Sequence, residues 1–343
     1  MRTRLCLFLM GLFLVVGLAI GSASYAQTAK PIELKLSHFL SPMHNTHTDV
    51  FVPFAKELEE RTKGRVKVTI FPGEALGKAK DHYDMAMQGI VDMAYFTPGL
   101  TAGRFPLTTA VELPIGIPSA KAGSLIIWEL YHKYLKAEYP GVKVLTLFTH
   151  GPGHIHMTKK PVRTLEDMKG LRIRSPGPTQ TALLRELGAS PLTMPIPDVY
   201  DALQKGMADG AVLAFSAIKD FKFYELIRYH TVSRLYVMPM GVGINLKVWA
   251  GLPPDIQKTM EDLCGSRMAE AAGVSYDKYD QLGIEAAEKV KAEIISLSPE
   301  EKKRWSARFK TFNDKWIADT EAKGLPGRKV FEEVRSLVEK YSK

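Results

Sequence analysis

The feature that most constrains the fold of this chain of 343 residues is a short internal sequence repeat, called the echo below. Residues 81–94, DHYDMAMQGIVDMA, and residues 198–211, DVYDALQKGMADGA, share the pattern D-x-Y-D-x4-G-x2-D-x-A without a gap. Each copy has apolar residues at helical spacing, a glycine that ends the helix, and then an apolar strand. Unrelated helix–turn–strand units can converge on such a pattern, but six ungapped matches favour two equivalent lobes with a ligand cleft between them. The matched pairs are Asp81/Asp198, Tyr83/Tyr200, Asp84/Asp201, Gly89/Gly206, Asp92/Asp209 and Ala94/Ala211.

The rest of the sequence alternates between strand and helix patterns. Strands separated by helices predict an α/β fold whose parallel sheets are covered by helices. From residue 254 to the end, nearly every segment is predicted to be helical. The predicted strands are 32–37, 66–70, 91–96, 142–148, 171–174 and 211–215, and the predicted helices before residue 254 include 48–62, 80–88, 119–137, 179–187 and 198–205.

The first 26 residues have the pattern of an export signal. Two arginines precede an apolar run at 5–20, and Ser24-Tyr25-Ala26 fits a small-x-small cleavage site. An uncleaved membrane anchor is the alternative, but the run is shorter than the ~20 residues that span a bilayer. We therefore expect a periplasmic protein that is cleaved near Ala26. Cleavage leaves Cys264 as its single cysteine, so the mature chain must depend on hydrophobic cores rather than on a disulfide.

The charge pattern excludes one class of partner. The net charge is +9, but the basic residues at 56–67 are interspersed with or flanked by glutamates. The sequence has no basic strip interleaved with aromatic residues, so we expect no nucleic-acid partner. A mildly positive field instead favours an anionic small molecule.

The segment 170–180, GLRIRSPGPTQ, is the most informative local motif. On a strand, Arg172 and Arg174 point to one side while Leu171 and Ile173 point to the other. An arginine at the carboxyl end of a parallel strand, beside a helix N-terminus, is well placed to bind an anion. Its guanidinium group offers a planar fork to both oxygens of a carboxylate. Two solvated arginines on an edge strand fit the same residues equally well.

Taken together, these motifs resemble the periplasmic solute-binding component of TRAP transporters, the DctP family. The resemblance is carried by the export signal, GLRIRSPG, the KG-x2-DG pattern at 205–210, PGEALG at 72–77 and the long C-terminal helices. It covers residues from about 30 to 340. It implies an α/β, two-lobe periplasmic binding protein fold (type II-like) with a long C-terminal helix that crosses both lobes. It also implies that an organic anion is captured and delivered to the large and small membrane subunits of a TRAP permease.

The resemblance further implies a division of the chain and a binding residue. The expected parts are a signal peptide at 1–26, a first lobe at 27–150 plus about 240–279, and a second lobe at about 151–239 plus 280–343. The family's carboxylate-binding arginine falls on Arg174, and Arg172 takes the place of a solvated basic residue. Neither enzymatic activity, a cofactor nor a metal ion is expected.

Two departures from the family pattern concern the ligand. Members that bind sugar acids carry polar residues shortly after the Asp209-Gly210 pair, where this chain has Val212, Leu213, Ala214 and Phe215. Many members also place a second arginine after the strand at 142–148, where this chain has His154-Ile155-His156. Few polar partners suit an aromatic or apolar monocarboxylate, or an aryl 2-oxoacid, better than a polyol. A sugar acid or a small organosulfonate is the alternative ligand.

The stretch THGPGHIHM at 149–157 has three histidines, His150, His154 and His156. We expect His154 and His156 to line the cleft and to donate hydrogen bonds to the bound acid. A structural role and a zinc site are the alternatives, since neutral imidazole is a common zinc ligand. Further candidates for the cleft lie near strand ends or in turns, and each could equally be ordinary packing. They are His38, Glu74, Tyr95, Phe96 and Met194.

A function of another class is an exported hydrolase. The sequence contains no G-x-S-x-G elbow, no H-E-x-x-H motif and no glycine-rich phosphate loop between a strand and a helix. A receptor that presents its ligand to a sensor protein is a further alternative that the same residues allow.

Overall fold

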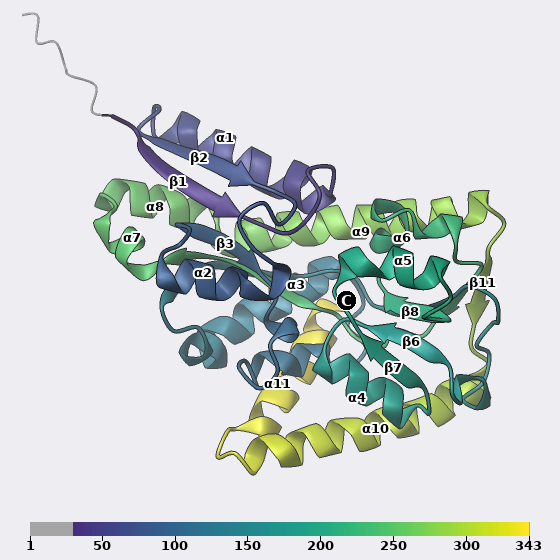
Figure 1. Ribbon diagram of the computed structural model, residues 1–343. Helices are drawn as coiled ribbons and strands as arrows, with labels where there is room; N and C mark the ends of the chain where they lie inside the picture. The colour runs from purple at the N-terminus through teal and green to yellow at the C-terminus, as the bar shows by residue number, and fades with distance from the viewer. Residues whose placement is uncertain (1–29, 343) are drawn as a thin grey trace, which may run out of the picture.

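The computed structural model describes residues 30–342, so the predicted signal peptide lies outside the described residues. The chain forms two β-sheets that lie side by side, each covered by helices (Figure 1). The sheet of the first lobe has the order β2-β1-β3-β10-β4. Its strands are β1 (Ile32–Ser37), β2 (Val66–Phe71), β3 (Met93–Phe96), β4 (Val142–Thr149) and β10 (Pro239–Asn245).

The sheet of the second lobe has the order β11-β9-β5-β8-β6-β7. Its strands are β5 (His154–Met157), β6 (Arg172–Ser175), β7 (Ser190–Thr193), β8 (Gly210–Leu213), β9 (Tyr229–Val232) and β11 (Glu293–Ser296). Most of these strands are wholly or largely buried, but β7 and β11, at the two edges, are largely exposed.

The two lobes have equivalent topologies, as the echo predicts. The echo strands β3 and β8 each have a parallel neighbour on one side, β1 and β6, and an antiparallel neighbour on the other, β10 and β5. Both sheets are therefore mixed, whereas the alternation of strands and helices predicted parallel sheets. The reason is that the chain crosses between the lobes after β4 and again after β9. The first strand after each crossing, β5 in the second sheet and β10 in the first, lies antiparallel to both of its neighbours.

Helices cover the faces of both sheets. Two short 3-10 helices in the first lobe are η3 (Pro98–Leu100) and η4 (Thr108–Glu112). The α-helices are α1 (Val52–Arg61), α2 (His82–Gln88), α3 (Ala120–Leu130), α4 (Pro178–Glu186), α5 (Val199–Gln204), α6 (Phe215–Asp220), α7 (Leu246–Gly251), α8 (Pro254–Leu263), α9 (Gly265–Lys289), α10 (Pro299–Glu321) and α11 (Gly327–Tyr341).

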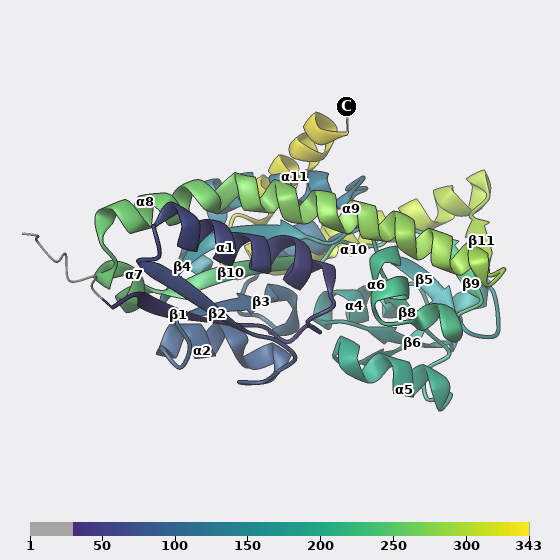
Figure 2. The ribbon, with the colours of Figure 1, turned by 90° about the horizontal axis from the view of Figure 1, so that it is seen from above.

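The long helix predicted to cross both lobes is confirmed. Helices α8 and α9 follow one another along one side of the molecule, and α9 runs from the first lobe to the second (Figure 2). Two glycines let α9 approach both lobes closely. A Cβ atom at Gly273 would crowd the backbone of Lys121 at the start of α3, and one at Gly283 would overlap the carbonyl oxygen of Phe215 in α6.

The C-terminal helices differ from the expected division of the chain. Helix α10 packs on α4 of the second lobe, but α11 packs on α3 of the first. The apolar face of α11, with Val330, Val334 and Leu337, is buried in the same core as Ile126 and Leu130. Residues 327–341 therefore belong with the first lobe, because that lobe is where the helix buries its apolar stripe. Within residues 30–342, we find no helix whose length and apolar character would let it cross a membrane.

Candidate functional site

A cavity lies between the two lobes and is lined by side chains from both. Its wall is mostly apolar and aromatic. The strand ends and the first turn of α6 contribute to it, as expected for a ligand site at the carboxyl ends of strands in α/β lobes. Apolar side chains of this wall include Phe39, Leu40, Leu100, Ile196, Leu213 and Met240.

The two crossover segments, 150–153 and 233–238, form the floor that joins the lobes. They are hydrogen-bonded to each other, because Gly153 N donates to Tyr236 O at 2.7 Å and Leu235 N donates to Gly153 O at 2.8 Å. These bonds fix the backbone beneath the cavity, so that His150, Tyr236 and Met238 are held in its wall.

Arg174 is the central charged residue of the site. It lies in β6, lines the cavity and is only 3% exposed. Its Nε atom donates to the carbonyl oxygen of Met194 at 3.0 Å, which orients the guanidinium group. Burial lowers the pKa of Arg174 to about 10, so the side chain stays positively charged at neutral pH. Within residues 30–342 no carboxylate forms an ion pair with it, and a buried cation without a counter-ion is a strong anion-binding group.

Arg172 occupies a different environment from Arg174, although both belong to the same strand. Its Nη2 atom is 2.6 Å from Asp209 Oδ1, and both side chains are substantially exposed. It lies at the amino end of β6, away from the cavity. The structure thus distinguishes two arginines that the sequence motif alone leaves equivalent.

Neutral rings make up much of the wall near Arg174. The His150 ring centroid is 5.4 Å from that of Tyr236 and 6.4 Å from that of Tyr276. The next ring, His44, is 6.1 Å from Tyr276. Burial lowers the pKa of His150 to about 4 and that of His44 to about 3, so both imidazoles are neutral near pH 7. Arg174 is therefore the one permanent cation among the described lining residues.

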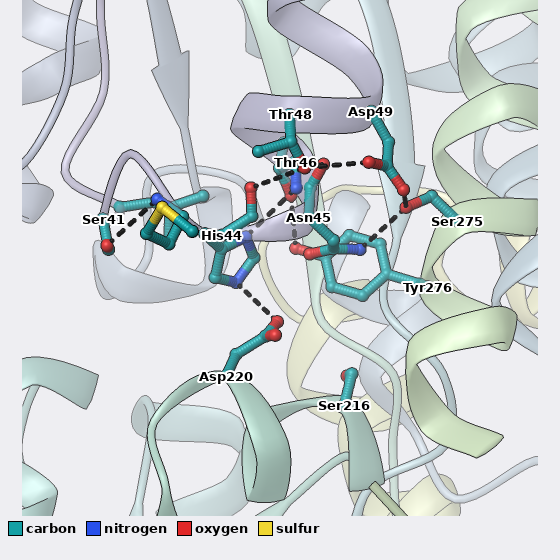
Figure 3. Close-up of polar contacts among 12 residues, drawn as sticks. Ser41, His44, Asn45, Thr46, Thr48, Asp49, Ser216, Asp220, Ser275 and Tyr276 are labelled. Atoms are coloured by element: carbon teal, nitrogen blue, oxygen red, sulfur yellow. Dashed lines mark hydrogen bonds and ion pairs between the residues drawn. The ribbon is translucent and has the colours of Figure 1, made fainter. Parts of the chain in front are cut away.

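A polar contact joins the lobes beside the cavity (Figure 3). His44 Nε2 of the first lobe faces Asp220 Oδ2 at the end of α6 in the second lobe, at 3.5 Å. The backbone N–H of Thr46 donates to His44 Nδ1, which places the ring proton on Nε2, toward Asp220. Burial raises the pKa of Asp220 to about 7.

Of the residues that the sequence assigned to the cleft, Arg174, Tyr95 and Leu213 line the cavity. His154 and His156 do not. They share one face of β5, as strand alternation predicts, but this strand lies inside its sheet and the face is packed against Phe215. Their expected place in the cleft must therefore be corrected, because the cavity lies at the strand ends and not over this buried face.

Both histidines instead hold the structure around the second crossover segment. His154 Nδ1 accepts from the backbone N–H groups of Ser233 and Arg234, at 3.2 and 3.1 Å. His156 Nε2 donates to Leu213 O at 3.1 Å, and its Nδ1 contacts His230 Nδ1 at 2.7 Å. No group of three or more histidine, cysteine or acidic side chains in residues 30–342 is arranged to hold a metal ion.

The remaining candidates lie behind the cavity wall or outside it. Phe96 is buried in the core beside Tyr83, and His38 contacts His47 at 2.9 Å. Glu74 forms an ion pair with Lys78 and accepts from Ala79 N. Phe215 packs on His154 and His156, whereas Met194 contributes its carbonyl oxygen to Arg174.

Sequence reasoning missed several rings of the wall. Tyr236 and Tyr276 come from the second crossover segment and from the long helix α9, and His44 comes from the loop after β1. No local motif marks them, because they meet only when segments far apart in the chain pack together. His150 was part of the conspicuous histidine stretch, and its place just after β4 was the available signal.

Two α/β lobes around a buried, unpaired cation are the architecture of a solute-binding protein. A sequence profile described as "Bacterial extracellular solute-binding protein, family 7" matches residues 36–319. The chain belongs to this family, the DctP family, which confirms the resemblance seen in the sequence. The family supplies the periplasmic substrate-binding component of TRAP transporters.

Solved structures share the fold over nearly the whole chain. A TRAP solute binding protein from Rhodoferax ferrireducens T118, in complex with copurified benzoate, is 31% identical with a TM-score of 0.86, covering 91% of this chain and 98% of that one. A protein from Bordetella bronchiseptica, with bound (R)-mandelate and (S)-mandelate, is 32% identical with a TM-score of 0.85, covering 90% and 99%.

A curated sequence relative is named for a ligand of another kind. The 2,3-diketo-L-gulonate-binding periplasmic protein YiaO of Escherichia coli (strain K12) is 29% identical over 206 residues. The match covers 59% of this chain and 63% of the relative, which is less than two thirds of its length.

Proposed function

We propose that this protein captures an aromatic or otherwise apolar monocarboxylate, including an aryl 2-oxoacid, and delivers it to a TRAP permease. The observation that carries this proposal is Arg174, a buried guanidinium group that has no carboxylate partner among residues 30–342 and lies in a ring-lined cavity. The ligand carboxylate would supply the missing counter-charge. The large and small membrane subunits of the permease would receive the ligand.

The composition of the wall supports an apolar ligand body. An aromatic ring beside Leu213 and Met240 gains roughly 25 cal/mol for each Å² of apolar surface removed from water. A sugar hydroxyl in the same position loses its water without gaining a partner, at about 1–3 kcal/mol for each group. The wall does contain hydroxyl groups, but that of Tyr95 is already directed at Met240 Sδ, 2.8 Å away.

The relatives support the same ligand class. The two structures described above hold benzoate and mandelate, both aromatic carboxylates, and each is at least 30% identical to this chain. A sugar acid is the second candidate ligand, favoured by the diketogulonate-binding relative. Small organosulfonates are a third, because arginine also suits their oxygen atoms.

The test is a side-by-side calorimetric titration with benzoate, mandelate, a uronate and a benzenesulfonate. We expect the aromatic carboxylates to bind roughly tenfold or more tightly than the uronate, the equivalent of one unpartnered hydroxyl. Tighter binding of the uronate would contradict the proposal. The free acids contain no bond that a hydrolase cleaves, so the alternative of an exported hydrolase is tested separately, by assaying release of acid from ethyl benzoate and ethyl mandelate; we expect none.

We also propose that the mature protein begins near Gln27 in the periplasm, and that its lobes close about hinges near 150 and 240. The crossover segments and α9 are the connections that would bend. Intact-mass analysis of a periplasmic extract tests the first point. Presentation of the ligand to a sensor protein is compatible with the same closed form.

A further inference from the structure

A buried acid–amide pair joins the two lobes outside the ligand cavity. Glu112, at the end of η4 in the first lobe, is 0% exposed, and Gln180, in α4 of the second lobe, is 1% exposed. Gln180 Nε2 donates to Glu112 Oε2 at 3.0 Å. Because η4 and α4 belong to different lobes, opening of the cleft would separate this pair and admit water.

The lobes approach to backbone contact next to this pair. A Cβ atom at Gly177, just before α4, would overlap the carbonyl oxygen of Gly99 in η3. A Cβ atom at Gly99 would overlap Glu112 Oε1. Glu112 thus lies directly behind a backbone contact between the lobes, and separation of the lobes would expose its carboxyl group to water.

Each member of the pair has one oxygen without a hydrogen-bond partner. These atoms, Glu112 Oε1 and Gln180 Oε1, are both buried. When Glu112 is ionised, both are acceptors and neither can satisfy the other. A proton on Glu112 Oε1 converts it into a donor, and a carboxylic acid facing a carboxamide then offers two complementary hydrogen bonds. The neutral acid therefore fits this environment better than the carboxylate.

The groups that face Glu112 do not offset the cost of its charge. Helix α4 contributes hydrogen bonds from Gln180 and Thr179, and η3 contributes Gly99. Tyr236 is close enough for Glu112 to raise its pKa, and its phenol is neutral near pH 7. Burial is the largest influence on Glu112 and raises its pKa to about 7.

No basic side chain on the other neighbouring elements lowers the pKa of Glu112 within residues 30–342. The remaining elements packed against η4, which are α3, α11 and β10, place no lysine, arginine or histidine of residues 30–342 where it acts on this carboxyl group. Arg174 lowers the pKa of Tyr236, but no such effect reaches Glu112.

We propose that Glu112 is a proton-binding site of the closed protein, so that capture of the anionic ligand is accompanied by uptake of one proton. In the open form, water solvates the carboxylate and the proton leaves. When the lobes close on an anion at Arg174, Glu112 is dehydrated, and the added negative charge in the same region favours the neutral acid further. The inference goes beyond the proposed function and depends on it only for the anion that closes the lobes.

The test compares the wild-type protein with Glu112→Gln by calorimetry at pH 6, with benzoate as the probe, in buffers of different ionisation enthalpy. The glutamine mimics the neutral acid, because its amide can donate to Gln180 Oε1 and accept from Gln180 Nε2. We expect the wild-type protein to take up about one proton more per benzoate than the variant. Between pH 6 and pH 8, wild-type affinity should fall about tenfold more than that of the variant.

The matched control is Asp220→Asn, which removes another buried carboxyl group at the lobe interface. The Glu112-dependent difference should persist in this background. Equal proton uptake by the wild-type protein and Glu112→Gln would overturn the proposal, and Glu112→Met serves as the second variant if the first does not fold. Absence of heat with benzoate in every protein contradicts the proposed ligand class instead, and the comparison is then made with the acid that most raises the melting temperature.

Discussion

Replacing Arg174 should change ligand affinity and ligand-free stability in opposite directions. In the proposed complex the guanidinium group would pair with the ligand carboxylate, so its removal would leave that anion buried and unpaired. Truncating one side of such a pair costs roughly 2–5 kcal/mol, on the order of thirty- to several-thousand-fold in affinity. Arg174→Lys keeps the charge but loses both the planar fork and the Nε bond to Met194 O, so it should also bind more weakly.

Without ligand, the same guanidinium group is a buried charge, 3% exposed and without a carboxylate partner in residues 30–342. Arg174→Met retains the length of the aliphatic stem and removes the charge. It should therefore raise the free energy of unfolding by about 1–3 kcal/mol, the cost of one poorly satisfied buried polar group. Urea unfolding of the ligand-free protein measures this change in the free energy of unfolding, and calorimetry with benzoate measures the loss of affinity.

Arg172→Ala is the matched control, since it removes an arginine of the same strand, two residues before Arg174. Its exposed ion pair with Asp209 contributes about 0–1 kcal/mol, and its loss should leave benzoate affinity unchanged. The reasoning is refuted if Arg172→Ala weakens binding more than Arg174→Met does. A ligand-free Arg174→Met protein that is less stable than the wild type would show that the arginine is satisfied by partners other than the ligand.

Three further outcomes are expected. The free energy of unfolding should fall as pH drops below about 6.5, because burial holds the pKa of six histidines well below that value in the folded state while the unfolded chain binds protons there. Three buried carboxyl groups with a pKa of about 7 oppose this trend but are outnumbered, so higher stability at pH 5 than at pH 7 in urea unfolding would contradict it. Gly283→Ala should destabilise the protein by about 1–3 kcal/mol in thermal unfolding, since the added methyl group overlaps Phe215 O, whereas an alanine at exposed Gly251 in α7 should have little effect. Small-angle scattering should show a smaller radius of gyration with saturating benzoate, and identical profiles would count against lobe closure.

Local sequence patterns, together with the family resemblance, were sufficient to predict the two lobes and an arginine that lines the cavity between them. The echo at 81–94 and 198–211 corresponds to α2–β3 and α5–β8, which occupy equivalent places in the two sheets. The phrase GLRIRSPG forms β6 and the turn before α4, and it places Arg174 in the cavity. These features were predictable because helix periodicity, glycine stops and strand alternation are encoded by neighbouring residues.

Only the tertiary structure decided what covers each face. The alternation of β5 correctly predicted that His154 and His156 share one face. It did not predict that Phe215 would cover that face. The apolar stripe of α11 predicted burial without showing that the first lobe would receive it. A pattern records that a side chain is buried, and the partner that buries it lies elsewhere in the chain.

The same limit applies to the cavity and to the interface between the lobes. Tyr276 meets Thr46, 230 residues away in the sequence, and Glu112 meets Gln180 from the other lobe. Nothing near either residue in the sequence specifies its partner, because these contacts form only when two separately folded lobes close on each other. The sequence by itself determined the family, the two lobes and the arginine, whereas the packing of the lobes decided which rings line the cavity and which acid is buried between the lobes outside it.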